Sequence, residues 1–237
     1  MLGVFSVVAG RKSAVTRVSS EAAAIVAASS GGTLQAVTYL CVSDYVGGTR
    51  WRMQAGCYAL TLGEQGIFAR AHALREACRS EEISLRWQVI LADGWGIDLY
   101  GDRVAPGSLD SYCAFMTQEA EARGFTTVRW STLTDQNRSV YDRAVEQVRS
   151  KARELAPWEA TKGEIAHDKP AASEALGIAE EHICMRAAES AVVVADRGAT
   201  LVLSTEGPGL VRYDNLIVPR ASYTHLYTMP FLAHRLP

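Results

Sequence analysis

The chain has 237 residues, of which 48% are hydrophobic and 21% are charged, with 19 glycines and seven prolines. This composition excludes a disordered or low-complexity chain, and the length suits a single domain. Lysine and arginine number 24 against 26 acidic residues, a formal net charge of -2. That balance excludes a uniformly basic nucleic-acid-coating protein but leaves room for a local basic patch.

The predicted elements alternate between strands and helices. In chain order they are a hairpin and a helix within an N-terminal extension (1–33), a strand (34–42), an extended segment (50–60), a helix (63–78), a strand (85–92), a helix (108–123), a strand (126–130), a helix (135–155) interrupted at Pro157, a helix (170–194), a strand (199–204) and an extended segment (210–219). Such alternation predicts an α/β fold, with a mostly parallel central sheet covered by helices on both faces.

Sequence patterns also argue against several kinds of site. No apolar run approaches the roughly 18 residues of a membrane span, and the apolar start precedes basic residues, the reverse of a secretory signal. We therefore expect a cytoplasmic protein, with reduced and mostly buried thiols. The sequence contains no glycine-rich phosphate-binding motif, so ATP or NAD binding is not predicted. Neither the cysteines nor the histidines have metal-ligand spacing. We therefore expect no cofactor and no metal. The cysteines are Cys41, Cys57, Cys78, Cys113 and Cys184.

Ligands of α/β sheets bind outside the carboxyl ends of the strands. Ser43 follows the most hydrophobic strand and is a candidate nucleophile, with Asp44 beside it; the alternative is a turn or capping role for both. Asp93, Trp95 and Asp98 set two carboxylates and one aromatic ring among glycines, which suits recognition of a cationic side chain or an ordinary turn. The segments expected at this edge of the sheet are 43–45, 93–96 and 131–132.

The predicted helix 170–194 carries polar residues on an otherwise apolar surface. His182, Arg186 and Glu189 occupy positions i, i+4 and i+7, and therefore lie on one face. Two interpretations remain open: an Arg186–Glu189 pair at the surface, or a polar stripe in a pocket with Glu189 as acid/base or as ligand of a substrate amine. Beyond the following strand, Glu206 and Tyr213 flank a Gly-Pro-Gly break, and Tyr213 either supplies a phenolic proton or packs in the core.

Basic residues gather in the C-terminal half of the predicted helix 135–155. This pattern is typical of a solvated helix, and it also suits a patch that contacts nucleic-acid phosphates. The residues are Arg143, Arg149, Lys151 and Arg153.

These features together resemble the tRNA-dependent cyclodipeptide synthases, in particular their divergent, arginine-containing fungal branch. The sequence AVTYLCV before Ser43, the strand end VILADGWG (89–96) and the segment 126–149 carry the resemblance, although Met185 stands where the family has a helix tyrosine. The resemblance implies a Rossmann-like domain in which Ser43 receives the aminoacyl group from the first of two aminoacyl-tRNAs.

The same resemblance implies roles for the other candidate residues. Glu189 would hold or deprotonate the amine, with Tyr213 or His182 assisting proton transfer. Asp93 and Asp98 would cradle a guanidinium group, and the basic helix would contact tRNA. The remaining substrate-binding candidates are Asp44, Trp95, Arg186 and Glu206.

Two alternatives come from other classes of protein. The segments LGEQGIFARAHAL (62–74), VILADGWGIDLYGD (89–102) and LDSYCAF (109–115) are similar to isocyanide synthases, which have a Rossmann-like fold and use a free amino acid and a sugar phosphate. The third hypothesis is a non-enzymatic α/β binding module, in which His182, Arg186 and Glu189 form a structural network.

Overall fold

The structure is a computed structural model that describes residues 25–29, 31–41, 53–54, 57–58, 60, 62–93, 108–161, 172–204 and 213–227. Residues 25–28 are helical, and a helix was predicted within the N-terminal extension (1–33). The predicted hairpin lies outside the described residues. So do five of the candidate site residues: Ser43, Asp44, Trp95, Asp98 and Glu206.

The central sheet has five strands, and every pairing in it is parallel. The predicted strands are confirmed within two residues at each end, and their observed bounds are β1 (Thr33–Cys41), β4 (Ser84–Ala92), β5 (Thr126–Arg129) and β6 (Thr200–Ser204). The fifth strand, β7 (Tyr223–Tyr227), was not predicted, and the extended segment expected over 210–219 is instead a series of turns at 213–217. Within the segment 50–60 only β2 (Met53–Gln54) and β3 (Cys57–Tyr58) are described, as a small antiparallel pair.

The helices agree with the predicted pattern, with one correction. They are α4 (Leu62–Ser80), α6 (Ser108–Glu121), α7 (Trp130–Gln136), α8 (Arg138–Glu159) and α10 (Ala172–Arg197). The single helix predicted over 135–155 is divided at Asn137, and α8 continues through Pro157 to Glu159. Proline is tolerated there because it removes only one hydrogen bond, in the last turn, and Ala160 N still donates to Ala156 O at 2.8 Å.

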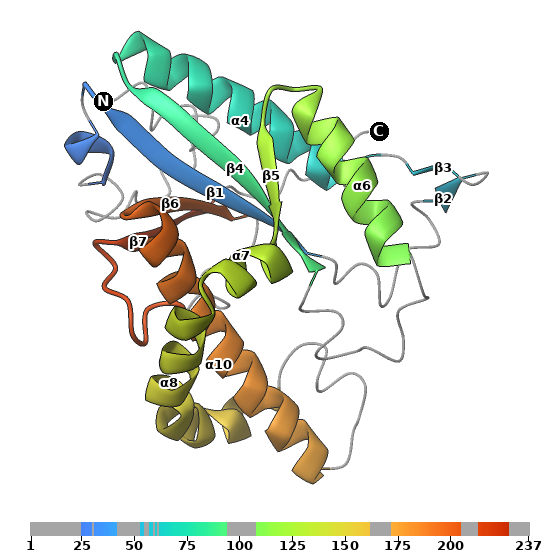
Figure 1. The fold of residues 1–237 in the computed structure, drawn as a ribbon, viewed down its shortest axis with the longest axis vertical. Helices are drawn as coiled ribbons and strands as arrows, with labels where there is room; N and C mark the ends of the chain where they lie inside the picture. The colour runs from blue at the N-terminus through green and yellow to red at the C-terminus, as the bar shows by residue number, and fades with distance from the viewer. Residues whose placement is uncertain are drawn as a thin grey trace, which may run out of the picture.

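Helices cover both faces of the sheet, as predicted (Figure 1). On one face, Leu34 and Val89 pack with the apolar side chains of α4 and α6. On the other face, Val37 and Ile90 pack with α7 and α10. This division follows from the alternation of side chains along β1 and β4. Helix α8 packs against α10 and extends the second layer away from the sheet (Figure 1).

The strand order is β5-β4-β1-β6-β7. The chain therefore adds strands on one side of β1 and then returns to add β6 and β7 on the other, which is the order of a Rossmann-like sheet. The point of reversal lies between β1 and β6, and ligands of such sheets bind at the carboxyl ends of the strands beside it. Gly198, with a φ of +78°, ends α10 and lets the chain enter β6.

Candidate functional site

Helix α10 brings its polar stripe to the carboxyl edge of the sheet. The helix ends at Arg197 beside the start of β6, where Thr200 pairs with Gln35 of β1. Burial and the nearby charge of Glu189 raise the pKa of Tyr39, which lies two residues before the end of β1. Glu189 therefore lies near the carboxyl end of that strand.

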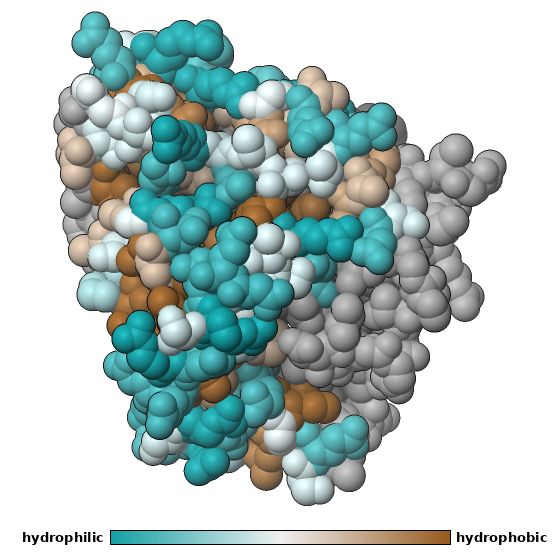
Figure 2. All heavy atoms as spheres, in the orientation of Figure 1, coloured by the Kyte–Doolittle hydropathy of each residue, from teal (hydrophilic) through white to brown (hydrophobic). Residues whose placement is uncertain are grey.

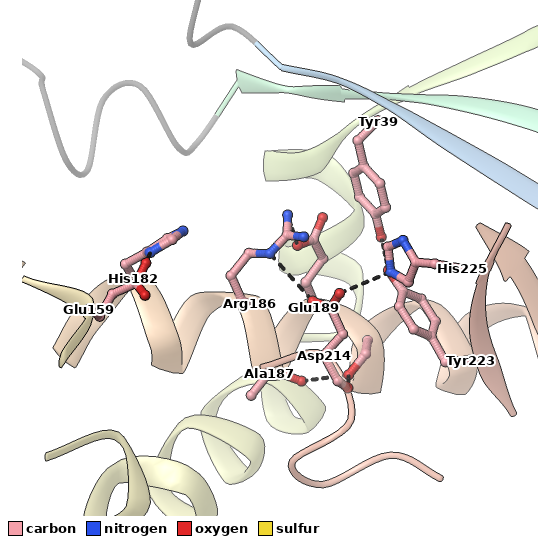
Figure 3. A network of polar contacts seen from close by, with 10 residues as sticks. Tyr39, Glu159, His182, Arg186, Ala187, Glu189, Asp214, Tyr223 and His225 are labelled. Atoms are coloured by element: carbon pink, nitrogen blue, oxygen red, sulfur yellow. Dashed lines mark hydrogen bonds and ion pairs between the residues drawn. The ribbon is translucent and has the colours of Figure 1, made fainter. Parts of the chain in front are cut away.

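A buried group of charged side chains occupies the interface between α10 and the sheet (Figure 3). The Arg186 Nη1 atom lies 3.5 Å from Glu189 Oε2, and Arg186 Nε lies 3.4 Å from Asp214 Oδ1. Their side chains are 7%, 1% and 0% exposed, respectively. The interpretation of Arg186 and Glu189 as a surface pair is therefore wrong, because the pair is enclosed between the helix and the sheet.

Three further residues, from β1 and β7, complete this buried group. His225 Nε2 lies 2.9 Å from Asp214 Oδ2, and the hydroxyl groups of Tyr39 and Tyr223 are hydrogen-bonded at 3.0 Å. Burial and the nearby charges of Glu189 and Asp214 raise the pKa of both tyrosines well above their ordinary value. We call these six residues the buried charged cluster: Tyr39, Arg186, Glu189, Asp214, Tyr223 and His225.

The sequence prediction missed four members of this cluster. Asp214 lies in a turn, and His225 and Tyr223 lie in the strand that was not predicted. The signal for β7 was the alternation of Tyr223, His225 and Tyr227, which places every second residue on one face of a strand. Tyr39 was visible only as part of an apolar strand, because strand periodicity does not say which helix covers that face.

A second polar contact links the end of α8 to α10. Glu159 Oε1 lies 3.1 Å from Nδ1 of His182, and the hydroxyl of Tyr213 donates to Glu159 Oε2. The carboxylate of Glu159 is 8% exposed and the His182 ring is 19% exposed. Tyr213, predicted to act on substrate or to pack, is buried and hydrogen-bonded to this carboxylate. Glu159 was not among the predicted site residues.

Asp93 and Ser131, from two of the three segments expected at the edge of the sheet, are in contact; the third segment, 43–45, lies outside the described residues. Asp93, directly after β4, accepts a hydrogen bond from Ser131 N at 2.8 Å and another from Ser131 Oγ at 2.6 Å. Ser131 lies in the first turn of α7, where backbone N–H groups have no partner within the helix. Asp93, 5% exposed, therefore caps α7 and joins the carboxyl ends of β4 and β5.

We expect Asp93→Ala to lower the free energy of unfolding by about 1–2 kcal/mol, because the N-terminal turn of α7 loses its acceptor. Asp93→Asn retains one acceptor oxygen and should cost less than half as much. Urea unfolding followed by circular dichroism measures both values. Equal losses for the two variants would contradict a capping role.

On the opposite face of the sheet, the helices that follow β1 and β4 share one buried polar contact. The Tyr112 hydroxyl of α6 donates to Glu64 Oε1 of α4 at 2.8 Å, and the two residues are 1% and 4% exposed. Each lies in the first turns of its helix, which begin at the carboxyl edge in a parallel α/β sheet. No periodicity in the sequence predicted that these two residues touch.

The basic residues of α8 are engaged with carboxylates or with the backbone. Arg149 contacts Glu180 and Glu181 of α10, at 3.1 and 2.7 Å, and Arg153 also contacts Glu180. Lys151 pairs with Glu154, and Arg143 donates to the carbonyl of Ser139. Figure 2 shows mainly hydrophilic side chains over the part of the surface where α8 lies. Phosphates would have to compete with these carboxylates for the two arginines.

Three cysteines within the described residues are free and buried: Cys78, Cys113 and Cys184. Burial raises the pKa of each thiol to about 11, so these thiols are protonated and poor nucleophiles at neutral pH. In the part of the chain that the structure describes, no group of three or more His, Cys, Asp or Glu side chains could hold a metal ion. None of the described helices is long and apolar enough to cross a membrane.

No protein-family model, no curated protein and no solved structure matches this chain. The fold and the polar contacts at the carboxyl edge are therefore the basis for a functional assignment.

Proposed function

We propose that the protein is an enzyme that acts on a free amino acid, in the manner of the isocyanide synthases. The observation that carries this proposal is the hydrogen bond between Tyr112 and Glu64. These residues come from two of the three segments that are similar to that family, and Asp93, from the third, lies close enough to Cys113 to influence its thiol. Three segments far apart in sequence thus contribute polar or titratable groups to one edge of the sheet.

The charges of the buried cluster suit an amino acid. The cluster places the acidic groups of Glu189 and Asp214 beside the basic groups of Arg186 and His225, and a free amino acid carries both an amine and a carboxylate. The ion pairs of Arg149 and Arg153 with α10 carboxylates favour a small substrate over one presented on tRNA, because tRNA binding relies on cations that reach phosphates.

The experiment is incubation of the purified protein with single amino acids and a sugar phosphate, followed by mass spectrometry for a product whose amine has become an isocyanide. We expect product from at least one amino acid, and a loss of at least tenfold in Glu64→Gln. The matched control is Glu76→Gln, an exposed carboxylate of the same helix that pairs with Arg79. Absence of product with every amino acid tested would refute this assignment.

A second candidate is cyclodipeptide synthesis from two aminoacyl-tRNAs. The observation in its favour is Glu189, which lies 1% exposed on α10 beside β1, the strand that precedes Ser43 in the sequence. In this mechanism Ser43 attacks the aminoacyl ester and Glu189 deprotonates the amine of the second substrate.

Expression in bacteria separates the two candidates. Diketopiperazines in the medium, lost in Ser43→Ala, would support the second candidate, and an arginine-containing product would support its fungal branch. If neither a diketopiperazine nor an isocyanide is found, both enzymatic candidates fail. The third hypothesis then stands: a non-enzymatic binding module in which the buried charged cluster is a structural network.

A further inference from the structure

Arg129 is the last residue of β5 and lies at the carboxyl edge of the sheet. It pairs with Leu91 of β4, whose side chain packs with α4 and α6. Paired residues of neighbouring strands point to the same face of a sheet, so the Arg129 side chain lies on the side that α6 covers. The ligands of a Rossmann-like sheet bind at the edge where Arg129 lies.

One ion pair orients the guanidinium of Arg129. Its Nη1 atom donates to Asp110 Oδ1 at 2.6 Å. Asp110 lies in the first turn of α6, which begins on the side of the sheet where β4 and β5 end (Figure 1). The hydrogen bond raises the pKa of Arg129 above its ordinary value, so the guanidinium stays charged. The two side chains are 38% and 73% exposed, which leaves both open to a ligand.

The Arg129–Asp110 pair keeps hydrogen-bonding groups that it does not use internally. A guanidinium has five N–H donors, and within the part of the chain that the structure describes Arg129 donates only to Asp110. Oδ2 of Asp110 likewise has no hydrogen-bond partner among the described residues. The donors on Nε and Nη2 of Arg129 are therefore available to an oxyanion, and Oδ2 of Asp110 is available to an amine.

The pair also lies close to the contact on which the proposed function rests. Besides burial, which raises the pKa of the Cys113 thiol, the charge of Arg129 lowers that pKa and the charge of Asp110 raises it. Both charges are therefore near Cys113. The preceding residue on α6 is Tyr112, whose hydroxyl donates to Glu64.

The buried charged cluster combines a guanidinium with carboxylates as well, but those groups are closed to solvent. Arg186 and Glu189 are 7% and 1% exposed and already contact each other. The Arg129–Asp110 pair presents the same two charges at the edge of the sheet, where a small molecule reaches them without opening the core.

We propose that Arg129 and Asp110 form the subsite that binds the main-chain groups of a free α-amino acid; this inference rests on the proposed action on an amino acid. The α-carboxylate accepts from Nε and Nη2 of Arg129 as a bidentate pair, and the α-ammonium group donates to Oδ2 of Asp110. The two ligand groups share one carbon atom, and the hydrogen bond between the two side chains holds their partners equally close together. An amino acid esterified to tRNA has no free carboxylate, so this subsite selects the free form.

The first test is binding, measured by calorimetry with the full chain and each standard amino acid in turn. For the amino acid that binds most tightly, we expect Arg129→Gln to raise Kd by about 10- to 100-fold, because charge-assisted hydrogen bonds are lost. Asp110→Asn should raise it by about two- to fivefold, because that carboxylate is mostly exposed. Arg129→Lys keeps the charge without the planar fork and should give an intermediate Kd. Failure of every amino acid to bind, or an unchanged Kd in Arg129→Gln, would overturn the proposal.

The amide of the same amino acid separates ligand binding from a merely structural role of Arg129. It lacks the carboxylate, so we expect it to bind the wild type about 10- to 100-fold more weakly than the acid does. In Arg129→Gln the acid and the amide should bind alike, because the partner of the carboxylate is gone. A variant that still prefers the acid by the wild-type factor would show that the carboxylate binds elsewhere, and would refute the subsite.

The matched control is Arg123→Gln, just beyond the C-terminal end of α6. Arg123 pairs with Glu119 at 2.7 Å and is 34% exposed, so this variant loses an ion pair similar in length and exposure. Its Kd for the amino acid should equal that of the wild type. Equal weakening by Arg123→Gln and Arg129→Gln would mean that only the net charge of the protein matters, and would refute the subsite.

Binding and turnover keep this inference separate from the proposed function. If an amino acid binds through Arg129 and no isocyanide forms, the proposed function fails and the subsite stands. If an isocyanide forms and Arg129→Gln leaves the KM for the amino acid unchanged, the proposed function stands and the subsite is refuted.

Discussion

Replacement of Arg186 by methionine is expected to lower the free energy of unfolding by about 3–5 kcal/mol. The guanidinium lies between the carboxylates of Glu189 and Asp214, and all three side chains are nearly inaccessible to solvent. Methionine has a similar length and fills much of the same space, so the loss reports the two carboxylates left in a buried environment without their shared cation. Urea unfolding at pH 7, followed by circular dichroism, measures the difference.

Two further variants make this result interpretable. Arg186→Lys keeps a positive charge but cannot contact both carboxylates through separate nitrogens, and we expect it to lose less stability than Arg186→Met. Arg138→Met removes a cation from an exposed pair with Asp135 and should leave the urea midpoint unchanged. A loss below about 1 kcal/mol in Arg186→Met would mean that the carboxylates are neutral in the folded protein or reach water, and would remove the ionic account of this cluster.

The sequence was sufficient for the layered architecture, because that architecture depends on periodicity. Residues 34–42 and 85–92 are mainly apolar, as is typical of strands covered on both faces, and they form β1 and β4. The sequence was not sufficient where a contact between distant residues decides where a helix begins or ends. The pattern from Asp135 to Leu155 is helical throughout, but the cap that Asp93 gives to Ser131 starts a separate short helix before Asn137. That cap is a contact between residues 38 positions apart, and no periodicity predicts it.

The candidate site shows the same division. The spacing of His182, Arg186 and Glu189 was enough to place them on one face of a helix. In Figure 3, Arg186 and Glu189 point toward Tyr39 of the sheet, whereas His182 lies apart from them beside Glu159. The partners of His182 and Arg186 were not predictable, because Glu159 and Asp214 come from two other parts of the chain. The basic residues of α8 are a second case in which the helix face was predicted and the partners were not. Arg149 and Arg153 were identified correctly as one face of a helix, but the carboxylates of α10 that neutralise them are apparent only from the packing of α8 on α10.

The stability of the protein should fall steeply above pH 10, and the Tyr39–Tyr223 pair should account for much of the fall. Burial and the charges of Glu189 and Asp214 raise the pKa of both hydroxyls in the folded state, so each keeps its proton at pH values where an unfolded tyrosine, with a pKa near 10, has lost it. The folded state then binds more protons than the unfolded state, and its stability declines as the pH rises from 10 toward the raised pKa. Each tyrosine contributes a slope of about 1.4 kcal/mol per pH unit, or about 2.7 for the pair.

Urea unfolding at intervals between pH 8 and pH 11.5 measures this slope, and the double variant Tyr39→Phe/Tyr223→Phe isolates the pair. Both hydroxyls of the hydrogen bond are removed together in this variant, so its stability at pH 8 should stay close to that of the wild type. Its stability should then decline less steeply than that of the wild type above pH 10. Parallel declines in the two proteins would show that these hydroxyls ionise alike in both states, and therefore that the charges of Glu189 and Asp214 do not act on the face of β1 that α10 covers.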